Sequence, residues 1–263
     1  MPEQKKNNLH DQDALVAYYA SSEIAPAANP YWAARRALAK KLEQLQLQIQ
    51  TSETTIEELN RIGDAVEAQT QTLIDNPKRY GRTEWTADDK FGSWGMLQCE
   101  ATPIIGPSNP ISPELSIWFE ADGDAMKAFA HVTFNWCYEG SDNICHGGWV
   151  AAVFDEFLGT SQILSGKTGM TGYLTTHYHS PTPLNQQLLM TARVDKVEDK
   201  KVTMVGELHA GERLCASCEG LFIIPNKKRG VSAAFGETDA VVSHAGSSGN
   251  TSGNTSGNNS NSN

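Results

Sequence analysis

The sequence is poor in basic residues. It has 21 Lys and Arg against 31 Asp and Glu, so its formal net charge is −10. Proteins that bind nucleic acid regardless of base sequence need a basic face, because they must neutralise phosphates. We therefore predict no nucleic-acid partner. An anionic ligand would have to bind at a local basic cluster or at backbone N–H groups.

The sequence also lacks a long apolar run. No stretch approaches the roughly 18 residues of a membrane span. The N-terminal segment has no apolar core of a secretory signal, and its Glu3, Asp11 and Asp13 fit poorly with an Arg-rich transit peptide. These absences predict a soluble, cytoplasmic protein without a membrane span.

Cysteine is scarce and unevenly spaced, with five residues in all. An odd, scattered set predicts free thiols in a cytosolic chain. Cys215 and Cys218 form a C-x-x-C pair, but no second pair accompanies them and they lie in a stretch with a period of two. We therefore predict no metal site. Cys145 beside His146 does not favour a thiol nucleophile, because neighbours in a loop usually point apart.

The first half of the sequence is helical in pattern. Residues 1–28 are polar and predicted to be flexible, and residues 29–75 are predicted to form an antiparallel helical hairpin. Asn29 before Pro30 is typical of a helix start, and Thr54 with Glu57 predicts a second start with a capping box. Apolar residues at helical spacing follow each start; they are Leu38, Leu42, Leu45 and Ile49, then Ile56, Leu59, Ile62, Val66 and Leu73.

The second half changes to a period of two. After an irregular connection over 76–113, the alternation across 114–226 predicts five to six antiparallel strands, interrupted by one helix at 147–165. A long helix against a curved antiparallel sheet is an α+β fold. Residues 227–263 are predicted to be a disordered, low-complexity tail, since the last eighteen residues contain only Gly, Ser, Asn and Thr.

The run from His146 to Gly159 is the strongest candidate for chemistry. Gly147 and Gly148 begin the predicted helix, so their N–H groups are expected to be unsatisfied and able to stabilise an oxyanion. Asp155 lies about two turns later among small neighbours, where partial burial would raise its pKa. Glu156 is rotated about 100° from Asp155, so the two carboxylates do not face one another.

This run, together with later motifs, resembles the PaaI-like hotdog thioesterases and related members of the thioesterase superfamily. The further motifs are Gly169-Met170-Thr171-Gly172, Tyr178-His179-Ser180-Pro181-Thr182-Pro183-Leu184, Ala192-Arg193-Val194-Asp195-Lys196-Val197-Glu198 and Cys218-Glu219-Gly220-Leu221-Phe222. The resemblance implies a hotdog fold, a homodimer or homotetramer with its sites between subunits, and hydrolysis of acyl-CoA. CoA would be part of the substrate, and no cofactor is implied.

The resemblance also implies roles for single residues. Asp155 would be the general base or nucleophile, a Gly N–H at Gly147 or Gly148 would polarise the thioester, and Thr171 would orient water from the neighbouring subunit. His146 would fix the loop. We predict substrate contacts at His146, Asn143, Glu156, Gly172 and His179.

Some ligand contacts and rival functions stay open. Many relatives carry a basic residue where this sequence has Ser180. The clusters Lys200-Lys201 and Lys227-Lys228-Arg229 are most simply solvated ends of strands, and they are also the best basic candidates for the phosphates of CoA. One rival is a hotdog module that binds acyl-CoA, or acts as a scaffold, without hydrolysing it. Hydration of an enoyl thioester is a third reading.

Overall fold

The structure, a computed structural model, describes residues 19–91, 94–123 and 125–225. The predictions for residues 1–18 and for the tail 227–263 lie outside this part. The helices are α2 (Pro30–Thr51), α3 (Ile56–Ile74), α4 (Gly81–Thr86), α5 (Trp94–Ala101) and α6 (Gly147–Ser161), with short 3-10 helices η1 (Asp89–Phe91), η2 (Trp136–Tyr138) and η3 (Gln162–Ser165). The strands are β1 (Glu114–Asp122), β2 (Ala125–Thr133), β3 (Glu139–Ser141), β4 (Ile144–Cys145), β5 (Met170–Tyr178), β6 (Gln187–Val197), β7 (Lys201–Ala210) and β8 (Arg213–Ile223).

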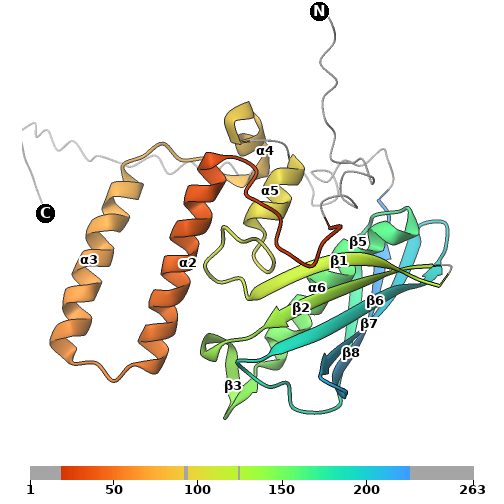
Figure 1. The fold of residues 1–263 in the computed structure, drawn as a ribbon. Helices are drawn as coiled ribbons and strands as arrows, with labels where there is room; N and C mark the ends of the chain where they lie inside the picture. Colours follow the sequence, from red (N-terminus) through yellow and green to blue (C-terminus); the bar gives the residue numbers. More distant parts are fainter. Residues whose placement is uncertain (1–18, 92–93, 124, 226–263) are drawn as a thin grey trace, which may run out of the picture. The chain divides into compact units, whose positions relative to one another are not determined.

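Six strands form one antiparallel sheet in the order β1-β2-β6-β7-β8-β5, and α6 packs against one face of it (Figure 1). The alternating apolar side chains of β2 and β6 face this helix, as the period of two predicted. From α6, the buried side chains Val150, Val153, Phe154, Phe157 and Leu158 complete the core. The predicted α+β hotdog arrangement, a long helix wrapped by a curved sheet, is confirmed.

The two edges of the sheet differ. Along β1, the N–H of Phe119 donates to the carbonyl oxygen of Tyr19 (3.0 Å), and the two rings pack edge to face. Tyr19 is buried. Residues 19–28, which were predicted to be flexible, thus have contacts with the rest of the domain at Tyr19, Ala25 and Ala28. At the other edge, β5 pairs with β8 on one side alone within the part of the chain that the structure describes.

The N-terminal helices are present, with one correction. Asn29 caps α2 as predicted, accepting from the Trp32 N–H (3.1 Å). The start of α3 is one residue later than predicted, because the side chains of Thr55 and Glu58 each accept from the other's backbone N–H and complete the capping box there.

The apolar stripes of α2 and α3 stay largely uncovered. The whole of α3 has no buried residue, and large apolar side chains of both helices are exposed. These are Leu38, Leu42, Ile49, Ile56, Leu59, Val66, Leu73 and Ile74. Within the described part of the chain, no surface buries the apolar stripes of α2 and α3, although such stripes normally pack against another element. No helix in these residues is both long and apolar enough to cross a bilayer.

The connection over 76–113 was predicted to be irregular, and this is wrong, because it contains α4, η1 and α5. These helices are too short to show a period in the sequence. Aromatic packing organises them instead. Trp85 and Phe91 pack edge to face with their ring centres 4.7 Å apart, and Trp32 donates from its indole N–H to the carbonyl oxygen of Phe91 (2.9 Å).

A buried ion pair ties α2 to α5. Glu100, whose side chain is 2% exposed, accepts two hydrogen bonds from the guanidinium of Arg36 (2.8 and 2.9 Å). It also accepts from the Ser108 hydroxyl (3.0 Å) and the Ala28 N–H (3.3 Å). Arg36 in turn donates to the carbonyl oxygen of Ala25 (2.6 Å). Both oxygens of Glu100 thus accept two hydrogen bonds each, and every nitrogen of the Arg36 guanidinium donates one, as a buried pair requires.

Candidate active site

His146 is the N-cap residue of α6. Nδ1 of His146 accepts from the N–H of Gly148 (3.0 Å), and the carbonyl oxygen of His146 accepts from Trp149 (2.9 Å). Nδ1 acts as an acceptor, so the proton of the neutral ring is on Nε2. Among the described residues, the N–H of Gly147 meets no acceptor. Of the two glycines predicted to offer free N–H groups, only Gly147 does so.

Two contacts fix this helix start. Tyr178, at the end of β5, donates its hydroxyl to the carbonyl oxygen of Gly147 (2.8 Å). Burial raises the pKa of Tyr178, which keeps the hydroxyl protonated as a donor. On the other side, Gly140 of β3 lies so close that a Cβ there would be 2.6 Å from Cα of His146. Tyr178 was part of a motif in the sequence, but the alternation of apolar and polar residues did not indicate that it contacts the start of the helix.

Asp155 contacts Thr171 within one chain. The Thr171 hydroxyl donates to Oδ1 of Asp155 (2.8 Å), and both residues are exposed. The resemblance implied that Thr171 would act from the neighbouring subunit, whereas here it holds the carboxylate of its own chain. A register shift between Thr171 and Tyr173 makes Gly172 the extra residue of a bulge. The partial burial expected for Asp155 is not provided by its own chain.

The spacing along α6 limits what one chain can do. Asp155 is eight residues after Gly147, so a rise of 1.5 Å per residue places them about 12 Å apart along the axis. A carbonyl that accepts from the Gly147 N–H must be attacked from about 3 Å away. A single copy therefore cannot bring its Gly147 N–H and its Asp155 carboxylate to the same carbonyl group.

The remaining predicted contacts lie around these groups. Glu156 is half-buried on the next position of α6. Asn143 forms the turn between β3 and β4 with a positive φ of 59°, and its N–H donates to Glu139 (2.7 Å). His179 is exposed beyond the end of β5, with Nε2 at 2.8 Å from the Ser217 hydroxyl.

Cysteine and metal chemistry have little support here. Burial raises the pKa of the Cys145 thiol to about 12, so it stays protonated at neutral pH. Cys215 and Cys218 are both buried, because a register shift at Leu208/His209 changes the alternation that predicted opposite faces. Within the described ranges, no three His, Cys, Asp or Glu side chains gather as a metal ion would require.

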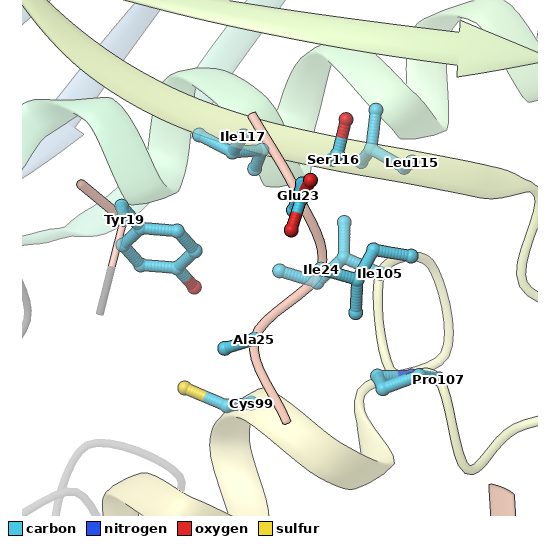
Figure 2. Close-up of a pocket in the computed structure, with 10 residues that line it drawn as sticks. All are labelled: Tyr19, Glu23, Ile24, Ala25, Cys99, Ile105, Pro107, Leu115, Ser116 and Ile117. Carbon is cyan, nitrogen blue, oxygen red and sulfur yellow. The ribbon is translucent and has the colours of Figure 1, made fainter. Parts of the chain in front are cut away.

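The cavities lie elsewhere. One pocket of about 30 Å³ is lined by Tyr19, Ile24, Cys99 and Ile117 among others, between the N-terminal segment, α5 and β1 (Figure 2). It has room for about one or two water molecules, far too little for an acyl-CoA. A polar groove of about 350 Å³ crosses the sheet face opposite the core, lined by Lys127, Arg193 and Glu219 among others. Asp155 lines neither.

Comparisons with known proteins match the part of the chain that carries these residues. The family profile described as "Thioesterase superfamily" matches residues 142–216, which include the start of α6, Asp155 and Thr171. An uncharacterized protein of Schizosaccharomyces pombe is 32% identical over 117 residues, 42% of this chain and 66% of that protein. The acyl-coenzyme A thioesterase THEM5 of Homo sapiens is 29% identical over 87 residues, 32% of this chain and 35% of that protein. The matches span less than two thirds of either relative.

A solved structure extends the likeness. The crystal structure of a thioesterase superfamily protein superposes with a TM-score of 0.60 and 26% identity, covering 78% of this chain and 94% of that one. Residues 114–225 make up less than half of the chain, so this match also includes residues outside the sheet and α6. In sequence and in fold, the hotdog domain of this chain is thus similar to the thioesterase superfamily.

Proposed function

We propose that the protein hydrolyses acyl-CoA thioesters at sites built from two copies of the chain. The observation that carries this is the pair of groups on α6. Asp155, held by Thr171, is exposed on one helical turn, and the open N–H of Gly147 is about 12 Å away at the helix start. In two antiparallel copies, Gly147 of one would meet Asp155 of the other, and the pairing would occur twice by symmetry.

The chemistry needs few groups, because thioesters have weak resonance and a good leaving thiolate. Asp155 accepts a proton from water as the water oxygen attacks the carbonyl carbon. The Gly147 N–H stabilises the oxyanion that forms. The C–S bond then breaks, the acyl group leaves as a carboxylic acid, and the proton is passed to the CoA thiolate. Direct attack by Asp155, followed by hydrolysis of the anhydride, would use the same two groups.

The open edge of β5 supports the pairing of two copies. An exposed edge strand with apolar side chains is a template for another strand, and proteins usually cover such edges. Met170, Tyr173 and Tyr178 are all exposed on β5, whereas Tyr19 covers the opposite edge of the sheet at β1. Asp155 would become buried in such a dimer.

Thiol release from a panel of acyl-CoA substrates tests the proposal. We expect Asp155→Asn to remove hydrolysis. Gly147→Pro removes the N–H and, like Gly147→Ala, adds a Cβ 3.3 Å from the Tyr178 ring. The backbone accepts Pro, since Pro is well tolerated at the first helical position and His146 already has the extended backbone that precedes Pro (φ −61°, ψ 129°). Loss of this donor should reduce kcat by about 10²–10³. Gly147→Ala, which keeps the N–H, is the matched control.

Mixed oligomers test the sharing of sites. If Gly147 and Asp155 act from different copies, an inactive Asp155→Asn copy paired with an inactive Gly147→Pro copy forms one intact site. Co-expression of the two variants should then restore part of the activity. Mixed oligomers as inactive as either parent would contradict the two-copy site, and equal rates for the native protein and Asp155→Asn would remove Asp155 from the mechanism.

A binding or scaffold role is the second candidate. The exposed apolar stripes of α2 and α3 favour it, because such faces commonly mediate contacts. Tight binding of acyl-CoA esters without hydrolysis of any of them would support this reading over the enzyme.

A further inference from the structure

One exposed arginine is fixed beside the loop that follows β5. Arg213 begins β8, and its Nη1 donates to the Ser180 hydroxyl oxygen (3.0 Å) and to the carbonyl oxygen of Pro181 (2.7 Å). Ser180 in turn donates to the carbonyl oxygen of Leu214 (2.7 Å). We propose that Arg213 binds a phosphate group of CoA, an inference that rests on the proposed function.

The charge of Arg213 is not compensated. Both of its acceptors are neutral, and across the described residues no carboxylate forms an ion pair with it. Arg193, which lines the groove on the sheet face opposite the core, is different, because it pairs with Asp195 at 3.2 Å. The two contacts of Arg213 use Nη1, so Nη2 and Nε remain to donate. A guanidinium that is held in place with two of its nitrogens free to donate suits a phosphate.

A continuous set of contacts connects Arg213 to the start of α6. Pro181 precedes Thr182, and the carbonyl oxygen of Thr182 accepts from the N–H of Cys145 (2.9 Å). Cys145 is two residues before Gly147. Each residue adds at most about 3.6 Å, so the guanidinium lies within roughly 20 Å of the Gly147 N–H in the same chain.

One CoA molecule can reach both groups. About a dozen bonds of ~1.5 Å join the sulfur of CoA to its first phosphorus in a zigzag, so the extended pantetheine arm spans roughly 15 Å. This length is comparable with the upper bound of roughly 20 Å on the separation, so a CoA ester with its carbonyl at Gly147 can extend a phosphate towards the Arg213 side chain. The cation that the sequence lacks before Pro181 would thus be supplied by β8, which the hydrogen bonds bring to that loop.

The basic candidates from the sequence are less suitable. Lys200 and Lys201 lie at the turn between β6 and β7, next to Glu198 and Asp199. Glu198 pairs with Lys196 at 2.9 Å. This turn adjoins the other end of β5, since Lys201 and Met170 both pair with Ile223. The cluster Lys227-Lys228-Arg229 lies outside the described residues.

Calorimetric titration of the full chain with CoA, dephospho-CoA and pantetheine tests this role. We expect Arg213→Ala to weaken CoA binding at least tenfold and to leave pantetheine binding unchanged. Arg193→Ala, which removes the same charge from a paired arginine, should bind CoA as the native protein does. If Arg213→Ala loses as much affinity for dephospho-CoA as for CoA, Arg213 binds the diphosphate. If its affinity for dephospho-CoA is unchanged, Arg213 binds the 3′-phosphate.

Two results would overturn the inference. Arg213→Ala could bind CoA as tightly as Arg193→Ala, or it could weaken CoA and pantetheine equally, which a disturbed loop would produce. Because binding is measured without turnover, the outcome is independent of hydrolysis. An inactive protein whose CoA affinity still depends on Arg213 would refute the proposed activity and leave the phosphate contact standing.

Discussion

The hydroxyl of Tyr178 donates a hydrogen bond of 2.8 Å to the carbonyl oxygen of Gly147. The last residue of β5 therefore holds the peptide group between Gly147 and Gly148, which directly follows the N–H that we assign to the oxyanion. Because β5 also carries Thr171, which holds Asp155, one strand contacts both ends of the proposed site. Two side-chain hydrogen bonds thus fix β5 and α6 relative to one another.

Removal of the Tyr178 hydroxyl tests the contribution of its hydrogen bond to Gly147. Tyr178→Phe keeps the ring beside Gly147 but loses one neutral hydrogen bond, which contributes about 1 kcal/mol. We expect kcat for acyl-CoA hydrolysis to fall about fivefold and the free energy of unfolding to fall by about 1 kcal/mol. Steady-state kinetics and urea unfolding measure the two effects. An unchanged kcat in a destabilised variant would mean that the contact serves the fold alone.

The contact between Thr171 and Asp155 gives a second prediction. Thr171→Val retains the shape of the side chain and removes the hydroxyl, so the carboxylate loses the donor that fixes its rotamer. We expect a fall in kcat of about tenfold, because a hydrogen bond to a charged group contributes about 1.5 kcal/mol or more. Thr171→Ser keeps the hydroxyl and should retain most activity. Equal rates for the Val and Ser variants would contradict a role for this hydroxyl.

Much of the fold was readable from the sequence, because alternation marks most strands of the six-stranded sheet and the buried stripe marks α6. The site was readable only in part. That Gly147 and Asp155 share one helix follows from spacing, but the capture of the Gly148 N–H by His146 depends on a side-chain rotamer. Thr171 contacts Asp155 of its own chain next to a β-bulge, and the alternation of the sequence does not reveal a bulge. Arg213 meets Ser180 through strand register, 33 positions away in the sequence.

The ion pair of Arg36 and Glu100 predicts a large effect on stability. Arg36→Met leaves the carboxylate of Glu100 buried without its cation, and breaking a buried pair in this way costs about 3–5 kcal/mol. We expect a loss of about 3 kcal/mol in urea unfolding, partly recovered when Glu100→Gln is added, since the amide is neutral. The double variant should be more stable than Arg36→Met. If it is less stable, the charge of Glu100 is not the source of the loss.

The Cys145 thiol predicts how stability depends on pH. Burial raises its pKa from 9.0 to about 12. The folded state therefore holds this proton more tightly than the unfolded state, so unfolding releases a proton between pH 9 and about 12. The stability that this group contributes is fully present below pH 9 and is lost as the pH rises, with a slope approaching 1.4 kcal/mol per pH unit.

Comparison with Cys145→Ala isolates this thiol from the other cysteines. Between pH 9 and 10.5, the unfolding free energy of the native protein should fall more steeply than that of the variant, and below pH 8 the two curves should run parallel. Because a protonated, buried thiol is a poor nucleophile, the variant should also keep its kcat at pH 7, and iodoacetamide at pH 8 should leave Cys145 unmodified in the folded protein. Rapid labelling of Cys145, or loss of activity in the variant, would reopen the thiol as a nucleophile and displace Asp155 from that role.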